Sequence, residues 1–220
     1  MRYRFTGAVV AMAVAAAAWL TVTPTAGQAR GQGQAAPAPA QGRGQARPAT
    51  VAGHPNFNGV WQAIGNAHWN LEDHSAAATP FWQLGAMFAI PAGQSVVVGG
   101  SIPYLPAGLK RREENMKGWP KSDPEAKCYM GGIPRSNYMP YPFQIFHSAK
   151  AIFFAYEYAG AARNIYLKDP GPPPVDSWMG QSVGKWEGET LVIDVTGFND
   201  QTWFDRSGNF HSEQLHVVAR

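Results

Sequence analysis

The chain has 220 residues, of which 45% are hydrophobic and 15% charged, and its formal net charge is +3. Five of its 18 basic residues and none of its 15 acidic residues precede residue 48, so the remainder has a formal net charge of −2. Nucleic-acid-binding domains normally carry an excess of Lys and Arg, so we expect no nucleic-acid partner.

Residues 1–29 have the features of a cleavable secretion signal. Arg2 and Arg4 precede an uncharged run over residues 5–22, and small residues stand at Gly27 and Ala29, the −3 and −1 positions of a cut after Ala29. The alternative is a permanent transmembrane helix, because the run is nearly long enough to span a bilayer. Its Ala-rich composition is only weakly apolar, so we expect cleavage, no stable membrane anchor, and an extracytoplasmic protein, either periplasmic or secreted.

Residues 30–52 form a segment rich in Gln, Ala, Pro and Gly, without aromatic residues. Such a segment buries too little apolar surface to offset its ordering entropy, and it predicts a disordered linker. The folded part is then residues 53–220, which is the length of a single domain.

The N-terminal half of this domain predicts a mixture of short elements. We expect strands over residues 57–64 and 96–98, and helices over residues 71–78, 81–88 and 106–116. The last helix carries Pro106 in its first turn, where a missing N–H is tolerated.

The C-terminal half predicts antiparallel strands rich in aromatic and β-branched residues. We expect them over residues 150–158, 163–167, 182–186, 190–196 and 210–219. Glu187 and Gly188 suit a two-residue hairpin turn. The proline-rich segment 169–174 cannot donate to a strand ladder, so it predicts a loop.

Together these elements predict a mainly β fold, either an antiparallel barrel-like domain or a sandwich, with a few short helices in the N-terminal half. The Gly59-Val60-Trp61 step is similar to the G-x-W of lipocalin-like (calycin) barrels, where the Trp closes one end of the barrel. The alternative is that Trp61 simply packs in a core.

Four stretches are distinctive: FNGVWQA, HWNLEDHSA, KCYMGGIPRSNYMPYPFQI, and the long segment that begins DSWMGQSVGKWEGETLVIDV. Together they resemble a family of secreted bacterial proteins without an established activity, over nearly all of residues 54–218. Relatives in that family continue beyond this point and typically have Glu in place of Ala219. The resemblance therefore implies that strands pairing with the last one are missing, and that a truncated copy without activity is one possible description of the chain.

A His and a carboxylate on one face of the last strand are candidate catalytic groups. His211 and Glu213 are two residues apart, which places them on one strand face. Asp205 lies just before the Ser207-Gly208-Asn209 turn that leads into this strand. A carboxylate that orients an imidazole raises its basicity, as a general base requires. The alternative is that His211 and Glu213 lie in water at the start of the strand.

A second group of residues predicts a binding site. Glu157 lies in an apolar run and Arg163 follows it across a turn, so a hairpin would pair them, either as a ligand contact or as a structural ion pair. Aromatic residues crowd the same half and suit a small-molecule cavity or a core. The predicted ligand-binding residues are Tyr156, Glu157, Arg163, Trp178, Trp186 and Trp203.

Metal and cofactor motifs give no positive signal. His68 and His74 are six residues apart, which does not place them on one helix face, and no third ligand is close in sequence. The chain has no phosphate-binding loop, dinucleotide fingerprint or G-x-S-x-G elbow. We expect no metal and no cofactor.

The leading hypothesis is an extracytoplasmic protein that binds a small apolar or aromatic molecule in an aromatic-lined cavity. The alternative is a cofactor-independent hydrolase, lyase or isomerase that uses the predicted His211–carboxylate pair.

Overall fold

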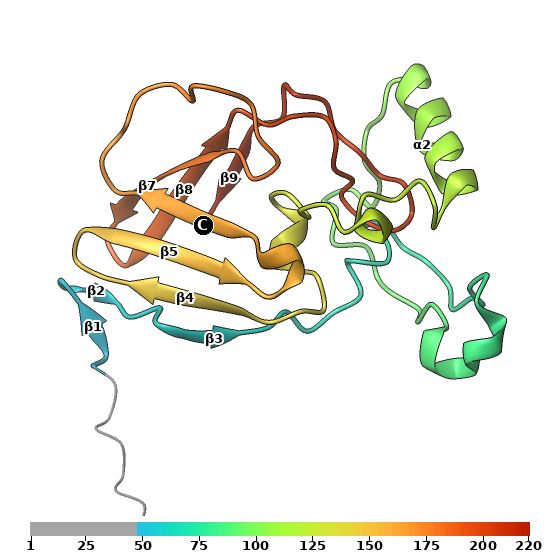
Figure 1. Ribbon diagram of the computed structural model, residues 1–220, viewed down its shortest axis with the longest axis horizontal. Coiled ribbons are helices and arrows are strands. Elements are labelled where there is room, and N and C mark those ends of the chain that lie inside the picture. The colour runs from blue at the N-terminus through green and yellow to red at the C-terminus, as the bar shows by residue number, and fades with distance from the viewer. Residues whose placement is uncertain (1–47) are drawn as a thin grey trace, which may run out of the picture. The chain divides into compact units, whose positions relative to one another are not determined.

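The computed structural model describes residues 48–220, and these residues form a mainly β fold (Figure 1). Seven strands make one sheet in the order β3-β4-β5-β6-β7-β8-β9, so that β3 and β9 are its edges. Their bounds are β3 Gly59–Trp61, β4 Phe143–His147, β5 Ala151–Tyr156, β6 Ala162–Tyr166, β7 Gln181–Glu187, β8 Thr190–Thr196 and β9 Val217–Ala219.

One pair of neighbours in this sheet is parallel, and all the others are antiparallel. β6 and β7 run in the same direction, and their register contains only Ile165 opposite Ser182 and Tyr166 opposite Val183. The prediction of a purely antiparallel sheet is therefore wrong at this step. The proline-rich segment after β6 carries the chain back to the start of β7, which a tight hairpin cannot do.

The predicted hairpin is confirmed, but its two-residue turn is Gly188-Glu189 rather than Glu187-Gly188, because Glu187 is the last residue of β7 and pairs with Thr190. β7 and β8 pair along their full length, and Gly188 takes the positive φ of 64° that this turn requires. The last predicted strand is much shorter than expected, because only Val217–Ala219 pairs with β8 while Phe210 forms an isolated bridge to Trp203. β4 was not predicted at all.

The start of the described chain is ordered. β1 (Thr50–Val51) and β2 (His54–Pro55) form a small antiparallel pair. Thr50 and Val51 belong to the end of the segment predicted as a disordered linker, and the pairing with β2 corrects that boundary. The secretion signal and residues 30–47 of the predicted linker lie outside the described residues.

The core lies on one face of the sheet and includes residues from β4 to β9. Alternate residues of β5 and β6, such as Ile152 and Ile165, are completely buried, as period-two burial requires. The sheet curves strongly, because the ring of Trp186 on β7 lies 5.7 Å from that of Phe57 and 5.8 Å from that of His147 on β4. Two intervening strands would keep these rings far apart in a flat sheet.

The N-terminal half contains less regular structure than predicted. The helix α2 (Pro106–Gly118) is confirmed, but residues 71–78 are not helical and residues 96–98 form a turn rather than a strand. The predicted second helix is a 3₁₀ segment, η1 (Trp82–Phe88), interrupted at Gly85. Three single 3₁₀ turns complete the elements: η2 (Glu125–Lys127), η3 (Arg135–Asn137) and η4 (Tyr158–Gly160).

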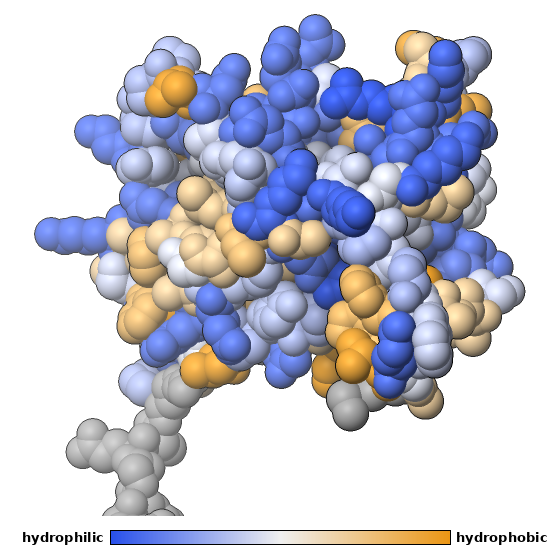
Figure 2. All heavy atoms as spheres, turned by 45° about the vertical axis from the view of Figure 1, so that its right-hand side comes forward, coloured by the Kyte–Doolittle hydropathy of each residue, from blue (hydrophilic) through white to orange (hydrophobic). Residues whose placement is uncertain are grey.

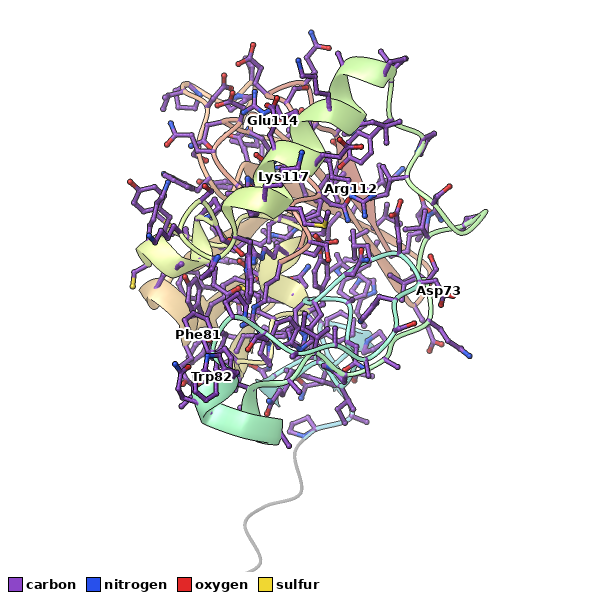
Figure 3. All side chains as sticks on the ribbon, turned by 90° about the vertical axis from the view of Figure 1, so that its right-hand side faces the viewer. Asp73, Phe81, Trp82, Arg112, Glu114 and Lys117 are labelled. Carbon is purple, nitrogen blue, oxygen red and sulfur yellow. The ribbon has the colours of Figure 1, made fainter. Side chains whose placement is uncertain are left out.

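α2 has no buried residue, and the described side chains of η1 are exposed. Figure 3 shows Arg112, Glu114 and Lys117 along α2 and Phe81 with Trp82 at η1, where the Trp82 side chain is 74% exposed. On the face drawn in Figure 2, hydrophilic residues cover most of the surface and the hydrophobic ones form separate groups. Within residues 48–220 no helix is long and apolar enough to cross a membrane.

A buried ion network joins the irregular half of the domain to the segment before β9. Arg135 is 1% exposed and binds both carboxylate oxygens of Asp123, at 2.8 and 3.0 Å, and one oxygen of Glu125 at 2.8 Å. Glu125 also pairs with Arg206, whose guanidinium lies 4.4 Å from the centre of the Trp69 ring. Arg135 is thus held by carboxylates of the chain itself.

Candidate functional site

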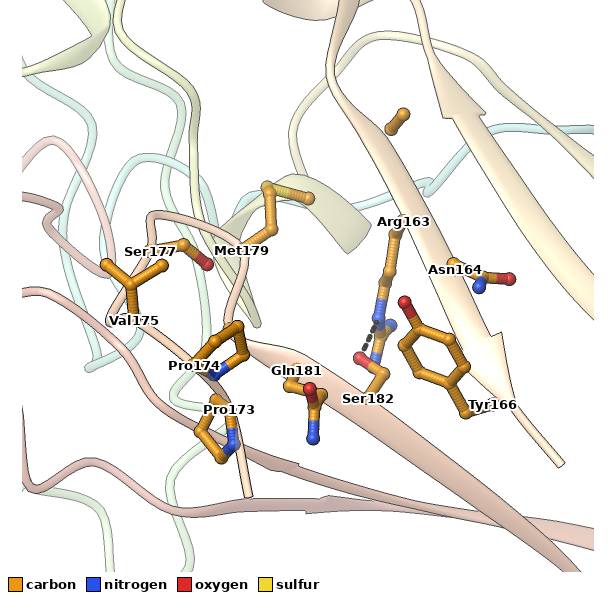
Figure 4. A pocket seen from close by; sticks show the side chains of 12 residues that line it. Arg163, Asn164, Tyr166, Pro173, Pro174, Val175, Ser177, Met179, Gln181 and Ser182 are labelled. Carbon is orange, nitrogen blue, oxygen red and sulfur yellow. Dashed lines mark hydrogen bonds between the residues drawn. The ribbon is translucent and has the colours of Figure 1, made fainter. Parts of the chain in front are cut away.

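A pocket of about 260 Å³ opens beside the point where β6 and β7 meet. Figure 4 shows its two walls. One is made by Pro173, Pro174 and Val175, from the proline-rich segment, and the other by β6, with Met179, Gln181 and Ser182 between them. The geometry follows from the parallel step, because the chain that returns from β6 to β7 must pass over this end of the pair.

Arg163 is the one charged residue among those that line the pocket. Its side chain is 3% exposed, and its Nε donates a hydrogen bond of 2.8 Å to Ser182 Oγ. The guanidinium also lies 5.6 Å from the centre of the Phe154 ring. Nη2 is buried and has no hydrogen-bond partner. In the part of the chain that the structure describes, no carboxylate forms an ion pair with Arg163.

The strand period explains why this cation is buried. In β6 the residues Arg163 and Ile165 face inward, while Ala162 and Asn164 are exposed. Burial lowers the pKa of Arg163, and the neighbouring Tyr156 opposes that shift. A buried guanidinium without a counter-charge is energetically unfavourable, so the fold alone does not account for this residue.

The predicted ion pair between Glu157 and Arg163 is not formed. β5 ends at Tyr156, and Glu157 takes helical backbone angles at the start of η4, with its side chain exposed. Tyr156, the last residue of β5, faces inward with Arg163, and Glu157 lies beyond the end of the strand. The residue opposite Arg163 on β5 is Phe154.

The predicted aromatic residues do not gather in this pocket. Tyr156 is buried in the core and donates a hydrogen bond to Asn137. Trp178 packs edge-on against Tyr129, and Trp186 stacks on His54 with ring centres 4.1 Å apart. Trp203 is buried near the bridge to Phe210. Among the predicted ligand-binding residues, Arg163 alone lines the pocket, whose one aromatic member is Tyr166.

His211 is buried, and its partner is a hydroxyl rather than a carboxylate. Its Nδ1 lies 2.9 Å from the carbonyl oxygen of Ser212, which can only accept, so Nδ1 carries the proton. Nε2 then accepts the hydrogen bond of 2.5 Å from Thr202 Oγ1. Burial lowers the pKa of His211, in agreement with a neutral ring. Neither residue lines the pocket at Arg163.

Neither of the two carboxylates predicted beside His211 is hydrogen-bonded to it. Asp205 is completely buried and accepts hydrogen bonds from the backbone N–H groups of Leu71, Ser207 and Asn209 and from the Asn209 side chain. Glu213 is exposed. The residues that were expected to form a catalytic group are thus separated, because the chain after Phe210 is not the regular strand whose period placed them together.

Two considerably larger hollows lie in the N-terminal half of the domain. One, of about 410 Å³, is lined mainly by Ala residues and Trp82, and the other, of about 500 Å³, is lined by residues 73–75 and 92–94. In the second, His74 packs so closely on Gly93 that a methyl group added there would lie 2.3 Å from the ring. Within residues 48–220 no three His, Cys, Asp or Glu side chains come together as a metal site.

Sequence reasoning missed Ser182 and Gln181, which form the base of the pocket with Arg163. The missing information was the parallel pairing of β6 with β7, which brings residues of the second strand beside Arg163. The inward Arg163 between outward residues was visible as a charged residue in a strand, but its expected partner was wrong.

Comparisons with protein families, with curated proteins and with solved structures found no significant match, so the geometry of the site carries the functional conclusions.

Proposed function

We propose that this is an extracytoplasmic protein that binds a small molecule in the pocket between β6 and the proline-rich segment. The observation that carries the proposal is the mixed lining: Pro173, Pro174, Val175 and Met179 supply apolar surface, while Arg163 and Gln181 supply polar groups. Ligand sites typically combine a mainly apolar wall with a few well-placed polar groups. The aromatic lining expected from the sequence is reduced in this proposal to Tyr166.

Ligand-observed saturation-transfer NMR with benzyl alcohol and benzamide tests this function. Val175→Trp should fill the mouth of the pocket and abolish the transfer signal of both probes. Val60→Trp is the matched control, because Val60 lies on β3 with an exposure of 72%, against 71% for Val175. Equal signals in the two variants, or no signal with the wild-type protein, would contradict the proposal.

Export is tested separately. When the full chain is expressed in a bacterial host, we expect an extracytoplasmic product that begins at Arg30 by mass spectrometry, because Ala29 and Gly27 are the small residues that signal peptidase requires. An intact N-terminus on a cytoplasmic product would contradict this part of the proposal.

We also propose that the curved sheet is barrel-like. The ring contacts of Trp186 with Phe57 and His147 support this. His147 is on β4 and Trp186 is on β7, and two strands lie between them in the sheet. Nitroxide labels at exposed positions Val60 on β3 and Val218 on β9 would report the closure. A distance between them close to seven flat strands, about 28 Å, would contradict it.

A second candidate is a cofactor-independent hydrolase that uses Thr202 as nucleophile and His211 as base. The hydrogen bond of 2.5 Å from the Thr202 hydroxyl to a neutral imidazole is the arrangement that activates a hydroxyl. Hydrolysis of p-nitrophenyl acetate is the test. Thr202→Val and His211→Gln should each abolish it under this candidate, and undiminished hydrolysis in either folded variant would refute it.

A further inference from the structure

We propose that the ligand of the pocket is a monocarboxylate, and that its carboxylate pairs with Arg163. This inference rests on the proposed small-molecule function and adds the chemical class of the ligand. It concerns the charge of the ligand, whereas the proposed function concerns only occupancy of the pocket, so the two can fail separately.

The two buried arginines of the domain differ in their partners. Arg135 is 1% exposed and Arg163 is 3% exposed, so both have left water almost completely. Two carboxylates, Asp123 and Glu125, neutralise Arg135. Arg163 has the neutral side chains of Ser182, Tyr156 and Phe154 instead, and its Nη2 has no partner. The domain therefore contains one buried cation whose counter-charge the described chain does not provide.

The pKa shifts of the two residues agree with this contrast. Burial acts to lower the pKa of Arg135, but the hydrogen bonds and charges of Asp123 and Glu125 more than offset it, and the pKa is raised. Burial also lowers the pKa of Arg163, and Tyr156 offsets this only in part. An anion beside Arg163 would reverse the direction of that shift, as the two carboxylates do at Arg135.

The charge of the pocket lining favours a carboxylate over a phosphate. Arg163 is the one charged residue among the twelve that line it, so the site supplies one positive charge. A carboxylate carries one negative charge and matches the planar guanidinium, whereas a phosphate monoester close to two negative charges would remain partly uncompensated. The opposite wall, formed by Pro173, Pro174 and Val175, provides apolar contact for the rest of the ligand (Figure 4).

Ser182 acts as a positioning residue in this arrangement. Its hydroxyl oxygen accepts from Arg163 Nε at 2.8 Å and fixes the plane of the guanidinium. Nε is thereby occupied, while Nη2 has two donors without a partner among the described residues. The protein thus orients the guanidinium, and the ligand supplies the negative charge that neutralises it.

Benzoate and benzamide form a matched pair of probes, because they have nearly the same shape and differ in charge. With the wild-type protein, isothermal titration at pH 7 should show benzoate binding at least tenfold more tightly than benzamide. Arg163→Met should remove this preference, and Arg163→Lys should retain part of it. Equal affinity for the two probes in the wild-type protein, with both still blocked by Val175→Trp, would overturn the carboxylate inference and leave the proposed function standing.

A second measurement uses only the wild-type protein, in case Arg163→Met does not fold. At matched ionic strength, benzoate should raise the midpoint of thermal unfolding relative to chloride, and inorganic phosphate should not. A larger increase with phosphate than with benzoate would overturn the inference in favour of a phosphate site. An unchanged midpoint with both anions would overturn it as well.

Discussion

Arg163 on β6 and Ser182 on β7 are joined by a hydrogen bond of 2.8 Å across the parallel pair of strands. The bond links two strands that are 15 residues apart at their nearest ends, Tyr166 and Gln181. It places a buried guanidinium beside a pocket and is the structural relationship on which the proposed ligand chemistry depends. We expect the other buried polar groups to affect the free energy of unfolding rather than ligand binding.

Asp123→Ala should destabilise the fold strongly. The substitution removes the bidentate partner of Arg135, which is buried and would keep only Glu125. Breaking a buried ion pair typically costs about 3–5 kcal/mol, and we expect about 3 kcal/mol because one carboxylate remains. Urea unfolding followed by Trp fluorescence measures it. Glu187→Gln, which removes an exposed ion-pair partner of Lys185, is the control and should leave the midpoint unchanged.

Asp205→Ala should act on folding and not on ligand binding. Its carboxylate accepts hydrogen bonds from the Leu71, Ser207 and Asn209 backbones, so its removal leaves buried N–H groups without a partner. Such losses cost about 1–3 kcal/mol for each unsatisfied group. Asp200→Ala, at an exposed position, is the control. A stable Asp205→Ala protein that no longer hydrolyses p-nitrophenyl acetate would instead support the catalytic role that the sequence suggested.

His68 should make stability depend on pH. Burial, assisted by the nearby Arg206 charge, lowers the pKa of His68 from 6.5 to about 4. The unfolded chain therefore binds a proton between these values while the folded protein does not, and stability falls as the pH decreases from 6.5 towards 4. After allowance for solvent screening, we expect about 1 kcal/mol of this loss by pH ~5.

The check on His68 is the urea midpoint measured between pH 7 and pH ~5. His68→Gln should flatten the profile over this range, whereas His216→Gln, at an exposed site paired with Asp194, should leave its slope nearly unchanged. An identical slope in wild type and His68→Gln would show that His68 is not the group responsible.

Thr202 and His211 should be energetically coupled. Both are buried, and the hydrogen bond between them leaves the imidazole nitrogen unsatisfied when the hydroxyl is removed. Thr202→Val should therefore cost about 1–3 kcal/mol. In a double-mutant cycle with His211→Leu, we expect a coupling free energy of about 1 kcal/mol. Strict additivity would show that the bond contributes nothing to stability.

The regular half of the fold was predictable because its signals are local. The apolar, β-branched run of β8 and the Gly188 turn were both visible in the sequence, as was Pro106 at the start of α2. The irregular half was not, because residues 71–78 and 96–98 are held by contacts distant in sequence. The Leu71 backbone, for example, is bound by Asp205 and by Ser95.

The candidate site was predictable only in part. A cation in an apolar strand identified Arg163, but its neighbourhood depends on a parallel pairing that no local signal reports. The carboxylate of Glu157 was the obvious partner by sequence distance, but β5 ends at Tyr156 and the Glu157 side chain is exposed. For His211, the partner Thr202 lies nine residues earlier, across a segment whose path follows no regular period.

The short parallel register between β6 and β7 divides the sheet into two antiparallel blocks, β3–β6 and β7–β9. The pairs β4–β5, β5–β6 and β7–β8 are close in sequence and can form early in folding, whereas the junction between the blocks must wait until the proline-rich segment has closed its loop. The pocket is built on that junction. It should therefore assemble after these hairpins and exchange its amide hydrogens before them, and a ligand that contacts both blocks would stabilise their junction.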